Sequence, residues 1–294
     1  MGHIHRGDLG QPSALRPYLV ARFIRIYPPF WCILVALILM QVVMGRLEPV
    51  LQGNPWAWVQ AFLLLPFDGV PPLTAAWTLS HEILFYLVFG LCILLGRGGF
   101  IVFGIWMLCC AGVFSRAETL TFPTSFLLSP NNLLFGIGLL AAAFFGQTSA
   151  ASNRLVLAGG AGLFLVITAL GRSLEDDWQI VAYGVASGLL VHGIANLELQ
   201  GRVRVPRPLE RLGDASYSIY LAHGPAMAFA AILLSRFDVT RSLSPVPSTL
   251  VLVAVGLIVG IVFHLFVERP LLGWMRRTTK RPFPPISAHR SELP

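Results

Sequence analysis

A histidine and a carboxylate stand side by side inside an apolar stretch, at His81 and Glu82. The apolar run that contains them continues to Leu95, and about 20 such residues can cross a bilayer as a helix. At a rise of about 1.5 Å per residue, Glu82 lies about 10 Å along that helix from Ala75, inside the span. An ionisable side chain costs about 3 kcal/mol or more at the centre of a bilayer, so the pair is a candidate functional group.

Two aromatic residues flank this pair on the same helix. Tyr86 follows Glu82 by one turn and shares its face, whereas Trp77 precedes His81 by one turn. The segment therefore presents two polar stripes about 100° apart, which favours a buried catalytic or substrate-binding face. The alternative interpretation is a polar helix end near the membrane interface, with Trp77 and Tyr86 in the aromatic belt.

Tyr217, Tyr220 and His223 form a second candidate group, each three residues after the one before. On a helix this spacing places all three near one stripe. Hydrogen-bonding groups on a membrane helix need partners within the protein, so the stripe is a candidate site. His264, one turn before Glu268, is instead interpreted as a satisfied core histidine.

Arginines and amides form two smaller groups. Arg22 and Arg25 share a helix face, and their guanidinium groups match phosphate oxygens; membrane anchoring is the alternative. Asn131 and Asn132 follow Pro130 inside an apolar run. A proline frees a backbone carbonyl that a side-chain amide can bind, so a structural role and a site role both stay open for these amides.

Membrane-spanning helices are the elements that must position these residues. The chain of 294 residues is 55% hydrophobic and 12% charged, with a mean hydropathy of +0.72. Soluble domains carry about 25% charged residues. The apolar runs are continuous rather than alternating, which excludes a β-barrel. The four cysteines lack metal-ligand or disulfide spacing and are interpreted as packing residues. The sequence predicts an all-α, polytopic helical membrane bundle.

Eight spans are predicted, and the loops between them are too short for a second domain. The spans cover residues 30–45, 75–95, 99–114, 126–145, 155–170, 178–195, 216–234 and 248–267. The expected parts are a cytoplasmic segment 1–29, a transmembrane domain 30–268 and a basic cytoplasmic tail 269–294. Small residues allow helices to approach closely, and five glycines are interpreted in this way. They are Gly159, Gly160, Gly162, Gly256 and Gly260.

Lysine and arginine are distributed unevenly between alternate loops. Of the 21 such residues, few fall on the side opposite the N-terminus. They are Arg46, Arg116, Arg172, Arg236 and Arg241. Basic residues concentrate in cytoplasmic loops, so both termini are expected in the cytoplasm. The net charge of +7 then reflects orientation in the membrane, and no nucleic-acid partner is expected.

Three stretches together resemble the membrane-bound acyltransferase family 3, which includes bacterial O-acetyltransferases of surface polysaccharides. The stretches are residues 22–28 (RFIRIYP), 77–86 (WTLSHEILFY) and 216–223 (SYSIYLAH). Their order and spacing carry the resemblance, which covers about residues 18–274. It implies a multi-pass enzyme of the bacterial inner membrane that moves an acyl group, with acetyl expected, from acyl-CoA to a sugar hydroxyl. The expected partners are membrane lipid, acyl-CoA and a carbohydrate acceptor, with no permanently bound cofactor and no metal.

The resemblance places the arginines, Glu82 and the Tyr–Tyr–His stripe in the functional core. Acyl transfer to an alcohol needs a base for the hydroxyl proton and a group that stabilises the oxyanion. His81 is the expected base, with Glu82 holding or polarising it. The candidate catalytic residues are His81, Glu82, Tyr86 and His223, and the candidate donor-binding residues are Arg22, Arg25, Tyr217 and Tyr220.

Members of this family usually begin with two further spans, the first of which carries an arginine and a histidine thought to be the catalytic base. The polar segment Met1–Arg16 stands at that place here, without the apolar core of a signal peptide. We therefore expect the 294-residue chain to have little or no activity by itself.

Two other classes of function fit the same composition. One is a transporter of a sugar or lipid-linked intermediate, with His81 and Glu82 as a proton relay. The other is a non-catalytic scaffold. The sequence shows no internal duplication of broken spans, which favours the enzyme over the transporter.

Overall fold

The computed structural model describes residues 10–170, 176–236 and 245–278. Within these ranges the regular elements are helices and helical turns, and no strand is present. The helices are α1 (Pro12–Val43), α2 (Pro55–Leu63), α3 (Ala76–Leu95), α4 (Arg97–Gly112), α5 (Thr124–Leu127), α6 (Leu133–Ala143), α7 (Ala150–Leu170), α8 (Asp176–Leu199), α9 (Arg207–Asp214), α10 (Ser216–Arg236), α12 (Pro245–Phe263) and α13 (Arg269–Thr278). Short helical segments at Pro49–Leu51, Phe114–Thr119, Pro130–Asn132 and His264–Glu268 complete them.

Seven segments among the described residues are long and apolar enough to cross a membrane. They are Pro12–Val43, Ala76–Leu95, Thr124–Ala143, Ala150–Leu170, Asp176–Leu199, Ser216–Arg236 and Val246–Met275. Each matches one of the eight predicted spans, so the all-α, multi-pass class is confirmed. The remaining predicted span, over residues 99–114, corresponds to the 16-residue helix α4. At about 1.5 Å per residue, α4 is shorter than the hydrocarbon core of a bilayer.

The helix that contains the first predicted span is longer than that span. Helix α1 is continuous from Pro12, with Pro28 and Pro29 buried inside it, so the helix that contains the first predicted span begins before Phe30. Each internal proline removes one N–H and leaves a carbonyl one turn earlier without its helical donor. Membrane helices tolerate this because neighbouring groups bind the freed carbonyls. The boundaries proposed for the N-terminal segment and the basic tail stay predictions, since residues 1–9 and 279–294 lie outside the described ranges, as do Arg172 and Arg241.

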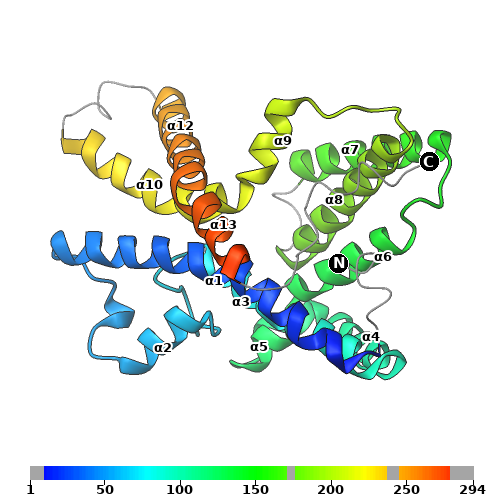
Figure 1. Cartoon of the computed structure of the whole chain (residues 1–294), viewed down its shortest axis with the longest axis horizontal. Coiled ribbons are helices and arrows are strands. Elements are labelled where there is room, and N and C mark those ends of the chain that lie inside the picture. The colour runs from blue at the N-terminus through cyan, green and yellow to red at the C-terminus, as the bar shows by residue number, and fades with distance from the viewer. Residues whose placement is uncertain (1–9, 171–175, 237–244, 279–294) are drawn as a thin grey trace. The chain divides into compact units, whose positions relative to one another are not determined.

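The chain divides into two compact units, each described by itself. Unit 1 comprises Met1–Arg16 and Thr78–Arg207, and it contains most of α3 and all of α4 to α8. In it α7 and α8 lie side by side (Figure 1). Gly160 lets them approach closely, because a Cβ there would lie 2.9 Å from Leu189 Cβ and 3.0 Å from the backbone nitrogen of Leu190. Gly159 and Gly162 face open space, so the packing role predicted for these two is wrong.

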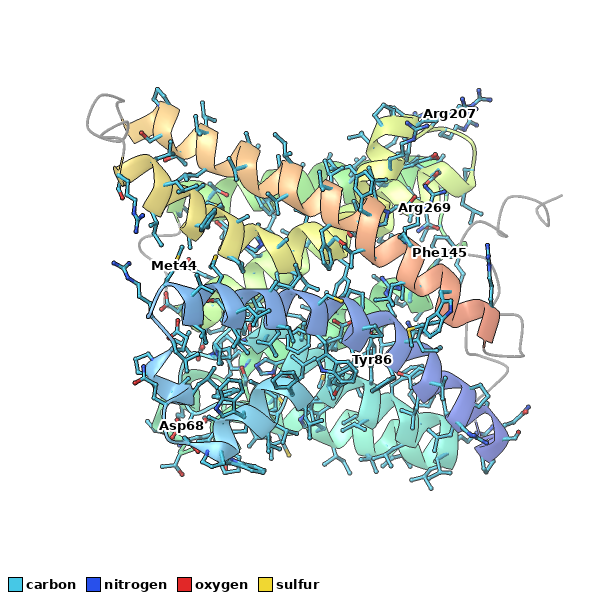
Figure 2. The ribbon with its side chains drawn as sticks, turned by 60° about the vertical axis from the view of Figure 1, so that its left-hand side comes forward. Met44, Asp68, Tyr86, Phe145, Arg207 and Arg269 are labelled. Carbon is cyan, nitrogen blue, oxygen red and sulfur yellow. The ribbon has the colours of Figure 1, made fainter. Side chains whose placement is uncertain are left out.

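Unit 2 comprises Pro17–Trp77 and Pro208–Pro294. Its α10 packs along α12, and Figure 2 shows α12 running on into α13, which carries the labelled Arg269. Two glycines of α12 make this approach possible. A Cβ on Gly260 would lie 2.5 Å from the Ile219 Cα, and one on Gly256 would lie 3.3 Å from the His223 Cβ. The packing role predicted for these two glycines is confirmed.

Candidate active site

Pro130 breaks one of the membrane segments of unit 1. The segment Thr124–Ala143 consists of the short helix α5, a turn at Pro130–Asn132 and helix α6. Proline has no N–H, so the carbonyl of Phe126, four residues earlier, loses its helical donor. The Nδ2 of Asn132 replaces that donor at 3.1 Å and also lies 3.0 Å from the Leu127 carbonyl oxygen. The prediction that an amide binds a carbonyl freed by Pro130 is therefore confirmed.

The same asparagine reaches His81 on α3. Asn132 Oδ1 lies 2.9 Å from His81 Nδ1, although the two residues are 51 positions apart in the chain. Both side chains are buried, with exposed fractions of 0% and 8%. The Phe126 ring stacks on the imidazole, with 4.3 Å between ring centroids and 28° between ring planes. His81 is thus held at one ring nitrogen and on one ring face.

Helix α4 supplies a further tie to the break. Trp106 Nε1 donates to the Leu127 carbonyl oxygen at 2.8 Å, so this carbonyl accepts from α4 and from Asn132. Phe85, one turn after His81 on α3, stacks on Phe135 of α6 with 4.4 Å between centroids and 5° between planes. These contacts fix α3, α4 and α6 around the imidazole.

Glu82 has a different partner from the one that the sequence suggests. The Tyr86 hydroxyl donates to Glu82 Oε1 across one turn of α3, as their shared face predicts. Tyr86, labelled in Figure 2, is buried, and Glu82 is partly exposed. Neighbouring residues on a helix diverge by about 100°, so Glu82 does not take the Nδ1 of His81. The group that lies at Nδ1 is Asn132, and a role of Glu82 in holding or polarising His81 stays a prediction.

In unit 2 the predicted stripe on α10 is present. The Tyr217 hydroxyl donates to the Ile26 carbonyl oxygen at 2.8 Å, close to the proline pair of α1. The Tyr220 hydroxyl donates to the Ala75 carbonyl oxygen at 3.0 Å. His223 Nδ1 lies 2.7 Å from the Tyr220 carbonyl oxygen on its own helix, so that nitrogen carries the hydrogen and Nε2 the lone pair. The tyrosines brace the stripe against other parts of unit 2.

The two arginines of α1 differ in their surroundings. Arg22 is partly buried and its guanidinium lies 5.4 Å from the centroid of the Tyr18 ring, within the range of a cation–π interaction. Arg25 is exposed. Neither environment identifies a ligand, so phosphate binding by the two arginines stays a prediction.

His264 and Glu268 form the pair that their spacing predicts. Nδ1 of His264 lies 2.7 Å from Glu268 Oε2, and the Ser218 hydroxyl of α10 donates to the same oxygen. Glu268 is 5% exposed and Ser218 is fully buried. The carboxylate ties α10 to the turn that follows α12, so the prediction of a satisfied core histidine is confirmed.

A second amide network in unit 1 was not found from the sequence. His192 and Asn196 of α8 meet Thr148 and Asn153 at the start of α7. Asn153 and Asn196 are both fully buried. The spacing of His192 and Asn196, one turn apart in an apolar helix, is the feature that could have pointed to it.

The elements and the buried polar residues define a multi-pass, all-α membrane protein with a histidine at a broken helix. A family model described as an acyltransferase domain matches residues 8–265. The chain therefore belongs to this family of membrane acyltransferases, the acyltransferase 3 family.

Two curated proteins are similar to the chain. The exopolysaccharide production protein ExoZ of Rhizobium meliloti (strain 1021) is 32% identical over 220 residues, which are 71% of this chain and 65% of ExoZ. Acyltransferase MdmB of Streptomyces mycarofaciens is 27% identical over 307 residues, 90% of this chain and 76% of MdmB. The chain thus spans slightly less than two thirds of ExoZ. No solved structure is significantly similar to the chain.

Proposed function

We propose that this chain transfers an acyl group from acyl-CoA to a hydroxyl of a carbohydrate during the production of a cell-surface or secreted polysaccharide. Membership of the acyltransferase family supports the reaction class. The name of ExoZ refers to exopolysaccharide production, which supports a carbohydrate acceptor. The observation that carries the proposal is the environment of His81, which lies on the same helix as Glu82. Its imidazole is buried, and its Nδ1 lies 2.9 Å from Asn132 Oδ1.

His81 acts as the general base in the proposed step. Its Nε2 takes the proton of the acceptor hydroxyl while the hydroxyl oxygen bonds to the thioester carbonyl carbon. The carbon–sulfur bond then breaks, and the departing CoA sulfur receives the proton from the imidazolium. The products are a carbohydrate ester and CoA with a free thiol, so atoms and electrons balance without a further reactant.

Glu82 and Tyr86 bind the acceptor in this proposal. A carboxylate has about four lone-pair positions, and the Tyr86 hydroxyl takes one of them. The remaining positions can accept hydrogen bonds from neighbouring hydroxyls of a sugar. Because Tyr86 is buried and bonded to Glu82, the carboxylate is oriented before the acceptor arrives.

The arginines of α1 and the stripe on α10 are the donor-binding residues of this proposal. The guanidinium groups of Arg22 and Arg25 match the phosphate oxygens of CoA. Tyr217 and Tyr220 brace α10 through their hydroxyls, and together with His223 they position the acyl-CoA in this proposal.

The bacterial inner membrane is the proposed location, with both termini in the cytoplasm. The distribution of lysine and arginine supports this orientation. Reporter fusions at Gly53 and Gly146 test it, because Gly53 follows the first span and Gly146 the fourth. We expect an external reporter at Gly53 and a cytoplasmic one at Gly146, and the reverse result would contradict the orientation.

The activity is tested with the purified 294-residue chain in lipid vesicles, supplied with acetyl-CoA and candidate oligosaccharides. Transfer at ordinary rates would contradict the expectation that this chain has little or no activity by itself. Release of the CoA thiol and mass increase of the oligosaccharide are measured together. We expect Glu82→Gln, Arg25→Ala and His223→Ala each to reduce transfer by about 100-fold or more in folded protein, given the usual contribution of one catalytic group. Arg154→Ala, which removes an exposed arginine of α7, is the matched control for Arg25.

Two outcomes would contradict the assignment. Full transfer by the Glu82→Gln protein would remove Glu82 from the site. Loss of all three variants from the membrane, with Arg154→Ala retained, would show that these residues stabilise the fold rather than take part in the reaction.

A further inference from the structure

The turn at Pro130–Asn132 determines which way the Asn132 amide faces. The carbonyl oxygens of Phe126 and Leu127 lie 3.1 and 3.0 Å from Nδ2. If the amide were turned over, its own oxygen would face both carbonyl oxygens, and three acceptors would meet without a hydrogen between them. Nδ2 therefore points at the two carbonyls, and Oδ1 points at His81.

This orientation determines the position of the hydrogen on the imidazole. Oδ1 of an amide can only accept, so the hydrogen in the 2.9 Å contact must belong to Nδ1 of His81. In the neutral ring the lone pair then lies on Nε2. Phe126, which provides one of the two carbonyls, also stacks on the imidazole and limits rotation of its plane.

We propose that Asn132 is a positioning residue, which holds His81 in the Nδ1–H tautomer with Nε2 as the basic nitrogen, and that the break at Pro130 fixes the amide of Asn132 for this purpose. The kinetic part of this inference rests on the proposed function, in which His81 is the base. An amide accepts the same Nδ1–H from the neutral ring and from the imidazolium, so one arrangement serves before and after proton transfer. The amide adds no negative charge that would keep the ring protonated.

A purely structural role for Asn132 predicts a different response to substitution. In that role the important bonds are those from Nδ2 to the carbonyls of Phe126 and Leu127. Asn132→Asp removes those donors but keeps an oxygen facing His81, whereas Asn132→Ala removes both functions. The two substitutions therefore separate support of the broken helix from orientation of the imidazole.

The tautomer is measured by NMR on the full chain labelled with ¹⁵N-histidine in lipid vesicles, because the two ring nitrogens of each tautomer differ in chemical shift. The chain has seven histidines, and the His81→Gln protein identifies the signals of His81 by difference. We expect the wild type to show the Nδ1–H signature of His81 and the Asn132→Ala protein to lose it. In Asn132→Asp we expect Nδ1 to keep its hydrogen, because a carboxylate oxygen facing it can also only accept. Asn131→Ala is the matched control, since that neighbouring amide donates to Ser129 Oγ at 3.0 Å.

Kinetics on the same proteins test the consequence. Asn132→Ala should lower kcat about 10- to 100-fold with little change in KM, as expected when a base is misoriented rather than removed. Asn132→Asp should recover part of that loss, because its oxygen orients the ring while its negative charge favours the protonated ring. Asn131→Ala should match the wild type.

The two proposals can fail separately. An Nε2–H signature in the wild type, an unchanged signature in folded Asn132→Ala, or equal loss of the signature in the alanine and aspartate proteins would overturn the positioning role. The expected signatures together with full transfer by His81→Gln would leave the tautomer assignment standing and overturn His81 as the base.

Discussion

Two histidine–asparagine pairs of unit 1 use opposite nitrogens of the imidazole ring. Asn132 accepts from Nδ1 of His81 at 2.9 Å. Asn196 instead donates through Nδ2 to Nε2 of His192 at 3.3 Å, while Nδ1 of His192 lies 3.1 Å from the Ala141 carbonyl oxygen. Both rings are Nδ1–H tautomers, because the partner of Nδ1 can only accept in each case. The difference lies in which ring nitrogen the asparagine bonds. Asn196 donates to Nε2 of His192, whereas Asn132 accepts from Nδ1 of His81.

The surroundings of His192 explain this difference. Asn196 Oδ1 accepts from the Gly146 backbone nitrogen at 2.7 Å, and the Thr148 hydroxyl donates to Asn153 Oδ1 at 2.6 Å. These bonds close the loop between α6 and α7 onto α8. Such a network satisfies backbone groups that have no water to bind inside a membrane protein. Asn196 and Thr148 lie at Nε2 of His192, whose network stabilises a loop, whereas Asn132 lies at Nδ1 of His81.

The largest expected effect separates the two histidines by activity. His81→Gln should reduce acyl transfer by about 10²–10⁴-fold, the usual contribution of a general base. His192→Gln should leave transfer per folded molecule within about threefold of the wild type, because no atom of His192 takes part in the proposed step. CoA thiol release by equal amounts of folded protein measures both. Equal losses of transfer in the two variants would contradict the assignment of His81 to the reaction and of His192 to the structure.

The sequence predicted the class of fold and some of the contacts around His81, but not the partner of its imidazole. Hydrophobic runs predicted the spans, and the one-turn spacing of Glu82 and Tyr86 predicted the shared face on which the structure shows their bond. The bond from an amide to a carbonyl that Pro130 frees was expected too. The pairing of His81 with Asn132 was not, because it joins residues 51 positions apart on different elements. Adjacency in the chain favoured Glu82 as the partner of His81, although neighbours on a helix point in directions about 100° apart.

Removal of the second amide should affect stability rather than activity. Asn196→Leu leaves the Gly146 N–H without its acceptor and Nε2 of His192 without the Asn196 donor. We expect a loss of about 3 kcal/mol in the free energy of unfolding, since each unsatisfied buried polar group costs about 1–3 kcal/mol. Thermal unfolding in detergent measures the loss, and transfer per folded molecule should stay unchanged. A fall in kcat with unchanged stability would assign the second network to the site.

Closer packing beside the second network should have a smaller effect. A Cβ on Gly193 would lie 2.9 Å from Leu157 Cβ and 3.0 Å from the Asn153 carbonyl oxygen, so α7 and α8 would have to separate. Gly193→Ala should cost about 2 kcal/mol of stability, within the usual range for overpacking. Gly162→Ala, where nothing lies within 4 Å, is the matched control and should not destabilise the protein. The same melting temperature for both variants would contradict the close contact of α7 with α8.

The smallest effect is expected at Trp106, which shares the Leu127 carbonyl with Asn132. Trp106→Phe removes the N–H that donates at 2.8 Å but leaves the Asn132 donor at 3.0 Å, so the carbonyl keeps a partner. The cost should be about 1 kcal/mol, the usual net value of one hydrogen bond. The ¹⁵N signature of His81 should stay that of the Nδ1–H tautomer, because the two bonds from Nδ2 still hold the amide in place. Loss of that signature in folded Trp106→Phe protein would show that α4, rather than the break at Pro130, orients the imidazole through Asn132.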